Sequence, residues 1–230
     1  RDRSPSRGLG DVYKRQLGRR GLRLSMAREE LLETQLAALA NAYKAVDNAD
    51  LWVMAPMVAT VEEATWFAER ARAHGLPKVG VMVETPAAAV LANRILGVAD
   101  FASIGTNDLS QYTMAADRMQ GELAELLSPW QPAMLAMVRA TCRGGDATGK
   151  PIGVCGEAGG DPLMALVLVG LGVKSLSMAP GKVRAVRAAL RLHDFDTCRQ
   201  MANYAADAPT AADAREAVLA LADPVLRDLL

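Results

Sequence analysis

The sequence has few aromatic side chains, few histidines and no excess of charge, and each shortage excludes a class of function. Aromatic residues make up 4% of the 230 residues, so platforms for stacking nucleic-acid bases are unsupported. The 26 basic and 26 acidic residues cancel, which gives no support for a nucleic-acid or membrane-surface partner. The two histidines, His74 and His193, form no cluster with cysteine that has the spacing of a zinc site.

Cysteine and long apolar runs are also scarce. Cys142, Cys155 and Cys198 show no pairing pattern, which favours reduced thiols over a disulfide framework. The longest apolar run, 163–173, is too short to span a membrane, and two glycines interrupt it. The sequence also has no signal peptide, so we expect a cytoplasmic protein.

Residues 1–16 do not match the rest of the sequence. They are basic, contain glycine and serine, and lack any apolar period. We interpret them as a non-native leader, similar to a translated library-adapter scar, and expect the native sequence to begin in mid-domain at Leu17. The alternative is a genuine disordered basic arm.

The remaining residues, 17–230, alternate between strand-like and helical patterns, and this alternation predicts an α/β fold with parallel strands. A hydrophobic content of 51% is enough for one large domain. A closed eight-stranded barrel would need three more strands than the five that we expect. The expected strands are 51–55, 79–84, 101–105, 152–155 and 175–178. The expected helices are 27–46, 61–74, 86–96, 122–143, 161–171, 181–191, 195–206 and 211–221, and the stretch 205–230 is expected to be a C-terminal helical tail.

Local signals support several of the expected helix starts. Thr60 with Glu63 has the capping-box pattern, and Pro86 suits the first turn of a helix. The Asp161-Pro162 pair opens another helix, and Thr210 is the expected N-cap of the last one.

Two acidic residues follow neighbouring strands. Glu84 ends the run 79–83, and Asp108 follows the strand 101–105. Adjacent parallel strands lie about 4.8 Å apart, so the two carboxylates fit one small hard cation such as Mg²⁺. The alternative for Glu84 is an acidic residue that interacts with a helix dipole.

The segment Gly105-Thr-Asn-Asp has a second possible use. Glycine permits close backbone approach, and the following amides and Asn107 can donate to an anion. An ordinary Asx-turn before a helix would use the same residues.

Cys155 and several arginines are candidates whose roles the spacing leaves open. Cys155 ends the strand 152–155, where it is either a functional thiol or a small packing residue. Arg118 could reach over the site as a phosphate or carboxylate fork. Arg20 and Arg23 lie at the start of the first helical region. By spacing alone, none of these arginines is assigned to a substrate.

Seven segments in collinear order resemble a known family, enzyme I of the bacterial sugar phosphotransferase system, the phosphoenolpyruvate–protein phosphotransferases. The resemblance covers essentially all of 17–222, and the ordered set is highly specific where single segments are not. The segments are Leu17-Gly-Arg-Arg-Gly-Leu-Arg, Met54-Ala-Pro-Met, Gly80-Val-Met-Val-Glu-Thr-Pro-Ala, Ser103-Ile-Gly-Thr-Asn-Asp-Leu-Ser-Gln-Tyr-Thr, Ala116-Asp-Arg, Gly153-Val-Cys-Gly-Glu and Leu176-Ser-Met.

The resemblance implies a (β/α)₈ TIM-barrel type of fold that binds phosphoenolpyruvate, here with about five of eight strands. Glu84 and Asp108 match the family's magnesium ligands. The substrate-binding positions of the family match Arg20, Asn107, Asp108 and Arg118. Cys155 matches the residue that handles the proton at the methylene carbon of the enolate.

The resemblance also implies partners outside this sequence. In the family, a histidine on a separate N-terminal domain accepts the phosphoryl group and passes it to the phosphocarrier protein HPr, and the barrel domain forms a homodimer. Neither His74 nor His193 has a matching context, and Arg19 stands where many relatives have an aromatic or apolar residue. We therefore expect a fragment of a longer phosphotransferase that does not autophosphorylate by itself.

Three other readings share part of this pattern. The phosphoenolpyruvate domains of pyruvate phosphate dikinase and phosphoenolpyruvate synthase have similar Gly-Thr-Asn-Asp and Cys-Gly-Glu segments. The segments 110–113, 115–118 and 175–180 favour enzyme I over both. A magnesium-dependent lyase or aldolase would use the same acid pair, but the segments around Cys155 and Arg118 argue against it. A non-catalytic dimerisation module is the remaining alternative.

Overall fold

The computed structural model describes residues 17–229, so the expected leader at 1–16 lies outside the described residues. Its core is a parallel sheet in which each strand pairs with the next one along the chain. This sequential order is typical of βα barrels, whereas doubly wound folds reverse the order within the sheet. The strands are β1 (Trp52–Val58), β2 (Lys78–Val83), β3 (Phe101–Gly105), β4 (Ile152–Cys155) and β5 (Ser175–Leu176).

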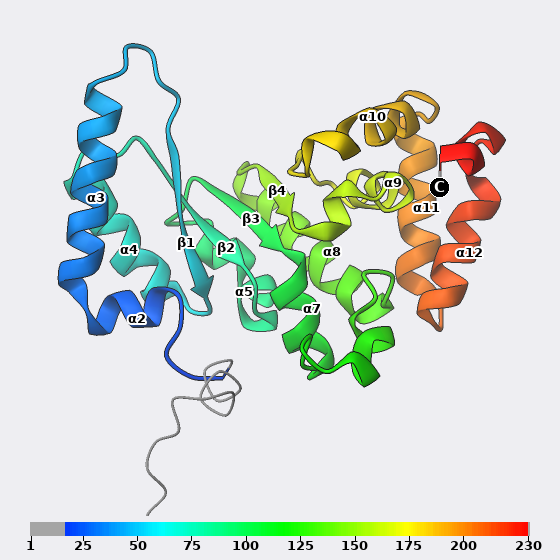
Figure 1. The fold of residues 1–230 in the computed structure, drawn as a ribbon, viewed down its shortest axis with the longest axis horizontal. Coiled ribbons are helices and arrows are strands. Elements are labelled where there is room, and N and C mark those ends of the chain that lie inside the picture. Colours follow the sequence, from blue (N-terminus) through cyan, green and yellow to red (C-terminus); the bar gives the residue numbers. More distant parts are fainter. Residues whose placement is uncertain (1–16, 230) are drawn as a thin grey trace, which may run out of the picture.

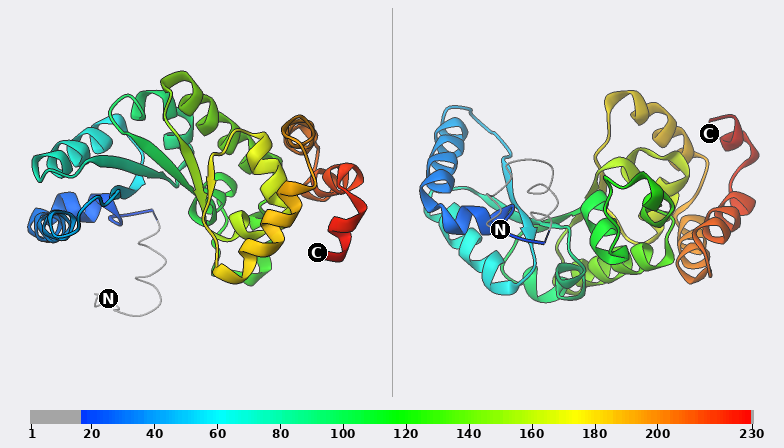
Figure 2. Two further views of the ribbon diagram at one scale, coloured as in Figure 1. Left: turned by 90° about the horizontal axis from the view of Figure 1, so that it is seen from above. Right: turned by 60° about the horizontal axis from the view of Figure 1, so that its bottom comes forward.

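The predicted α/β fold is confirmed as an incomplete barrel. Among the described residues, β1 and β5 are the two edges of the sheet and do not pair with each other. The strands form a curved row with helices around its outside (Figure 1, Figure 2). The α-helices are α2 (Leu22–Ala27), α3 (Glu29–Lys44), α4 (Val61–Ala73), α5 (Pro86–Val90), α6 (Ala92–Ile95), α7 (Thr106–Met114), α8 (Pro132–Thr148), α9 (Pro162–Gly170), α10 (Val183–Arg191), α11 (Phe195–Asp207) and α12 (Ala211–Leu221).

Four short 3₁₀ helices complete the secondary structure of the described residues. They are η1 (Gly121–Leu127), η2 (Glu157–Gly160), η3 (Pro180–Lys182) and η4 (Pro224–Leu229). None of the helices within 17–229 is both long and apolar enough to cross a membrane.

The predicted helix starts are confirmed by their hydrogen bonds. Thr60 and Glu63 form a complete capping box at α4. Pro86 lies in the first turn of α5. The Asp161 side chain accepts two backbone N–H groups of α9, and Thr210 caps α12. The starts of α4, α5 and α9 fix where the chain leaves β1, β2 and β4, whereas α12 follows the helix α11.

Several helical segments differ from the prediction. The segment 86–96, expected as one helix, is divided into α5 and α6 at Leu91. The segment 106–114, to which no helix was assigned, is the helix α7 and follows β3 directly, without the turn expected around Gly105-Thr-Asn-Asp. The segment 122–143, expected as one helix, is divided into η1 and α8 because Pro132 begins a new helix at its own position.

The C-terminal helices pack around α9, which is apolar on every side. Its residues from Pro162 to Leu168 are all buried, as expected for a helix without a polar face. Figure 1 shows α9 beside α10 and α11, with α12 outside α11. Gly170, the last residue of α9, lies directly against the backbone carbonyl of Cys198 on α11. The predicted helical tail is therefore packed onto the last buried helix of the barrel part.

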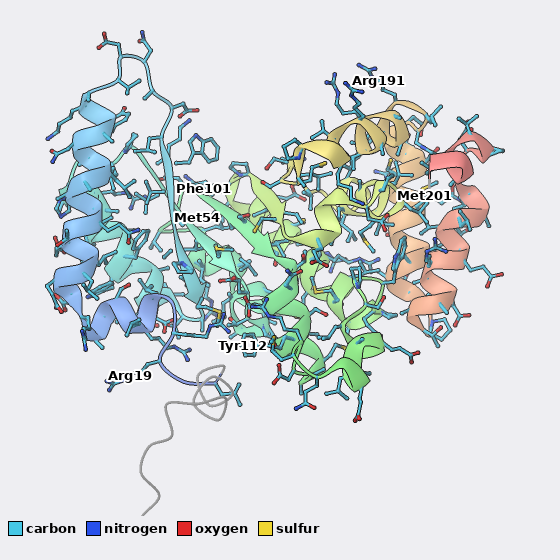
Figure 3. All side chains as sticks on the ribbon, in the orientation of Figure 1. Arg19, Met54, Phe101, Tyr112, Arg191 and Met201 are labelled. Atoms are coloured by element: carbon cyan, nitrogen blue, oxygen red, sulfur yellow. The ribbon has the colours of Figure 1, made fainter. Side chains whose placement is uncertain are left out.

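The face of the sheet that carries Trp52, Met54 and Phe101 holds large side chains. Trp52 and Met54 are exposed, whereas Phe101 is buried. Trp52 packs against Phe101 with 4.7 Å between ring centroids, and the Phe101 ring lies over Gly80. Trp52, Phe101 and Met54 line a hollow of about 370 Å³ on this face. Figure 3 labels Met54 and Phe101. In a closed barrel, side chains at such positions fill the interior.

We predict that Gly170→Ala destabilises the chain by about 1–3 kcal/mol, because the added methyl group would overlap the Cys198 carbonyl. Urea unfolding followed by circular dichroism measures the change. Gly181→Ala is the matched control, since a methyl group at Gly181 meets nothing within 4 Å. Equal stability of the two variants would contradict the packing of α11 on α9.

Candidate functional site

The candidate residues lie at one edge of the sheet, where β2, β3 and β4 end. Val83 pairs with Ile104, and Gly105 pairs with Cys155. Continuing this register by one residue places Glu84 beside Gly105, so Glu84, Gly105 and Cys155 form one row across three strands. Figure 3 shows Tyr112 of α7 at this same edge of the sheet.

Glu84 is held in a buried position by contacts on both sides. Its Oε2 accepts a hydrogen bond of 2.8 Å from the backbone N–H of Met57. On the other side it lies against Gly105, where an added Cβ would be 2.6 Å from the Glu84 Cγ. Only 6% of Glu84 is exposed. Burial raises the pKa of Glu84, the Met57 N–H opposes this shift, and the negative charge of Asp108 adds to it.

Asp108 is the second buried carboxylate, and two guanidinium groups face it. Arg20 Nη1 lies 3.2 Å from Oδ1, and Arg118 Nη1 lies 4.0 Å from Oδ2. Oδ1 has no hydrogen bond with suitable geometry among the described residues, in spite of its closeness to Arg20. Asp108 lies in the first turn of α7, where the helix dipole favours a negative charge.

Tyr112 completes the contacts of Arg20 and was not identified from the sequence. Its hydroxyl accepts a hydrogen bond of 3.0 Å from Arg20 Nη1. Burial lowers the pKa of Arg20, but Asp108 and Tyr112 outweigh that effect and raise it above its usual value. Tyr112 lies four residues after Asp108, so both side chains occupy one face of α7. A helix prediction for 106–114 would have revealed the pairing.

The segment that directly follows α7 positions Arg118. α7 ends at Ala115 in a left-handed conformation, and the chain then turns back along the helix. The backbone N–H of Arg118 donates to Gln111 Oε1 at 3.1 Å, which anchors this return. Arg23, by contrast, pairs with Glu63 at 3.0 Å and has no contact with the candidate site.

Cys155 and Asn107 lie beside Gly156 at the end of β4. The Cys155 thiol donates to the Ile104 carbonyl at 3.5 Å. Gly156 has a φ of 99°, and an added Cβ would lie 2.5 Å from Thr106 Oγ1 and 3.3 Å from Asn107 Oδ1. The exposed Asn107 is therefore adjacent to the segment that follows Cys155.

The two carboxylates of the site fit a magnesium ion that has few protein ligands. They do not make a metal site in which protein side chains supply all the ligands. Glu84 and Asp108 supply two carboxylates at one edge, one with a buried oxygen that lacks a hydrogen bond. No group of three or more histidine, cysteine, aspartate or glutamate residues with metal-site geometry occurs within 17–229. Magnesium is usually bound by one or two carboxylates together with water and substrate oxygens. The arrangement thus suits a cation that a phosphorylated ligand also coordinates.

We predict that Glu84→Gln stabilises the metal-free chain at neutral pH. A carboxyl group with a raised pKa in the folded chain makes the folded state bind more protons than the unfolded state. The ionised group therefore costs stability above the raised pKa, and this cost disappears as the pH falls to the ordinary glutamate value. The advantage of Glu84→Gln should shrink over the same range in thermal unfolding.

Glu216→Gln is the matched control for this measurement, because Glu216 is exposed on α12. It should leave the unfolding curve unchanged at every pH. A Glu84→Gln variant no more stable than the wild type at pH 7 would show that burial does not penalise the Glu84 charge.

Comparison with known proteins assigns this chain to a family. The chain is 46% identical over 213 residues to a Phosphoenolpyruvate-protein phosphotransferase of Streptomyces coelicolor. The match covers 92% of this chain and 38% of the relative. A protein of the same name from Haloferax volcanii is 41% identical over 224 residues, or 92% of this chain and 40% of the relative. A Multiphosphoryl transfer protein of Xanthomonas campestris is 44% identical over 206 residues, or 86% of this chain and 24% of that protein.

The chain therefore spans well under half the length of these relatives. A family model described as PEP-utilising enzyme, PEP-binding domain matches residues 15–195, which include every candidate residue discussed above. The chain belongs to the PEP-utilising enzymes and carries their PEP-binding domain.

Proposed function

We propose that this chain is the phosphoenolpyruvate-binding part of a phosphoenolpyruvate–protein phosphotransferase, and that it supports magnesium-dependent transfer of the phosphoryl group to a histidine on a further domain. The observation that carries the proposal is the gathering of two carboxylates, two guanidinium groups and a thiol at one edge of the sheet. The names of the relatives favour this function over that of a dikinase or an aldolase.

The ligand that this edge suits is a small dianion with a phosphate and a carboxylate. Arg20 and Arg118 offer planar guanidinium forks that match both groups, and Arg20 is fixed by Tyr112 and Asp108. The exposed Asn107 amide can donate to a phosphate oxygen. Glu84 and Asp108 would hold Mg²⁺, which when bound offsets the negative charge on the phosphate and enolate oxygens.

In the proposed transfer step, Cys155 is the proton donor. The phosphoryl group leaves the enol oxygen for a histidine nitrogen, and the electron pair of the broken P–O bond remains on pyruvate enolate. The thiol of Cys155 then gives its proton to the methylene carbon, which forms pyruvate. The resulting thiolate regains a proton from water, so charge and atoms balance.

The partners of this function lie outside the chain. The proposal includes a histidine-bearing domain, the phosphocarrier protein HPr as the next acceptor, and a homodimer of the barrel domain, as the first step of sugar uptake through the phosphotransferase system. The cytoplasm is the proposed compartment, since thiols such as that of Cys155 stay reduced there.

We predict that Asp108→Ala weakens Mn²⁺ binding by more than the 10–100-fold typical for loss of a supporting residue, because it removes one of two carboxylate ligands. Electron paramagnetic resonance of free Mn²⁺ measures the affinity, and Mg²⁺ should compete. Asp207→Ala, which breaks an exposed ion pair with Arg139, is the matched control. Unchanged Mn²⁺ affinity in Asp108→Ala would refute the metal assignment.

We predict that Cys155→Ala slows the exchange of pyruvate methyl hydrogens for solvent deuterium about 10²–10⁴-fold, the usual contribution of a general acid or base. Proton NMR with Mg²⁺ present follows this half-reaction without any histidine domain. Cys198→Ala, at a buried position on α11, is the control and should keep wild-type exchange. Equal rates in the two variants would show that Cys155 is a packing residue and not the proton donor.

A further inference from the structure

Met57 has a backbone conformation that a methionine rarely adopts. Its φ is 59°, in the left-handed region where a side chain clashes with its own backbone. Two other residues within 17–229 that are not glycine share a positive φ, but Asn48 lies between elements and Ala115 ends a helix. Met57 is the one that lies inside a strand. An unfavourable conformation within a strand calls for a compensating contact.

The conformation results from a bulge that inserts one residue into β1. Ala55 pairs with Val81 and Val58 pairs with Val83, so three steps along β1 match two steps along β2. The strand stays in register from Trp52 to Ala55, shifts before Val58, and Val58 is again paired and buried. The shift therefore lies close to the functional edge. Bulges of this kind re-aim a group near active sites.

The group that this bulge re-aims is the N–H of Met57. It donates to Glu84 Oε2 at 2.8 Å instead of to the β2 backbone. The preceding Pro56 has no N–H, so the bulge leaves no second donor unpaired. The bulge thus supplies a fixed donor to a buried carboxylate that needs one.

The same bulge supports Arg20 through its neighbour. Gly21 has a φ of 53°, and an added Cβ would lie 2.7 Å from Met57 Cβ, 2.9 Å from Met57 Cγ and 3.1 Å from the Pro56 carbonyl. Only glycine lets the segment before α2 lie this close. Since Arg20 directly precedes Gly21, the position of the bulge fixes where the Arg20 guanidinium meets Asp108.

We propose that the Pro56–Met57 bulge is a positioning element that sets the carboxylate of Glu84 and the guanidinium of Arg20 relative to each other. Met57 acts through its backbone N–H and Gly21 acts through its lack of a side chain, and neither is a catalytic residue. The metal-binding consequence rests on the proposed function, whereas the positioning itself can be measured without metal.

Amide NMR tests the contact directly. With ¹⁵N-methionine labelling, Met57→Ala identifies the Met57 signal by its loss. Glu84→Ala and Gly21→Ala should each move that signal upfield by several tenths of a ppm, because each removes or displaces the carboxylate acceptor. A Met57 signal that stays in place in both variants would overturn the proposal, whether or not the chain binds a metal.

Mn²⁺ affinity tests the consequence, with a control that carries the same backbone strain. Gly75 has a φ of 81°, but an added Cβ there meets nothing within 4 Å. Gly21→Ala should weaken Mn²⁺ binding about 10–100-fold, and Gly75→Ala should leave it unchanged. Adding Met57→Gly to Gly21→Ala removes the atoms that clash and should restore most of the affinity.

The outcomes distinguish the proposed magnesium site from the positioning role of the bulge. No Mn²⁺ binding by the wild type would reject the proposed magnesium site, and the amide signal would still decide the positioning. Wild-type binding that Gly21→Ala and Gly75→Ala reduce equally would reject the positioning role alone, because the effect would then come from backbone strain. Failure of Met57→Gly to rescue Gly21→Ala would likewise overturn the link through Met57.

Discussion

The structure of the site depends on how closely Glu84 lies between two backbone segments. A buried carboxylate is stable only with donors or cations around it, and within 17–229 Glu84 receives one N–H from β1 and no donor from β3. Gly105 instead leaves the space that the Glu84 side chain occupies. The requirement for a glycine on β3 and for a bulge in β1 therefore follows from a single buried side chain directly after β2.

Charge balance at this edge fits the proposed anionic ligand. Glu84 and Asp108 carry two negative charges, and Arg20 and Arg118 carry two positive charges within reach of Asp108. These four side chains together are close to neutral. The charges of a phosphorylated acid and a divalent cation largely offset each other, so binding both would leave the net charge of this edge small. The burial that raises the pKa of Glu84 is also the burial that strengthens each electrostatic contact with a ligand.

The sequence predicts the framework well because periodicity and caps act locally. The five strands and most helix starts, such as the capping box at Thr60, could be predicted from neighbouring residues alone. The meeting of Glu84 and Asp108 also followed, since parallel strands end at one edge. The helix α7 was missed because Gly105, Asn107 and Asp108 favour turns, and the contact of Tyr112 was missed with it. The conformation of Met57 depends on tertiary contacts that no local pattern contains.

Strand register is the means by which the sequence places the site. A shift of one residue in β2 or β3 would move Glu84 or Gly105 to the other face and would also expose the apolar residues of that strand. The apolar pattern that fixes the strand register therefore also fixes the position of the site residues, and no further residues are needed for this. The bulge in β1 is the one register shift among the described strands, and it lies between Ala55 and the buried Val58, where pairing with β2 resumes. The irregular step of this sheet thus coincides with the point where a backbone donor meets a carboxylate.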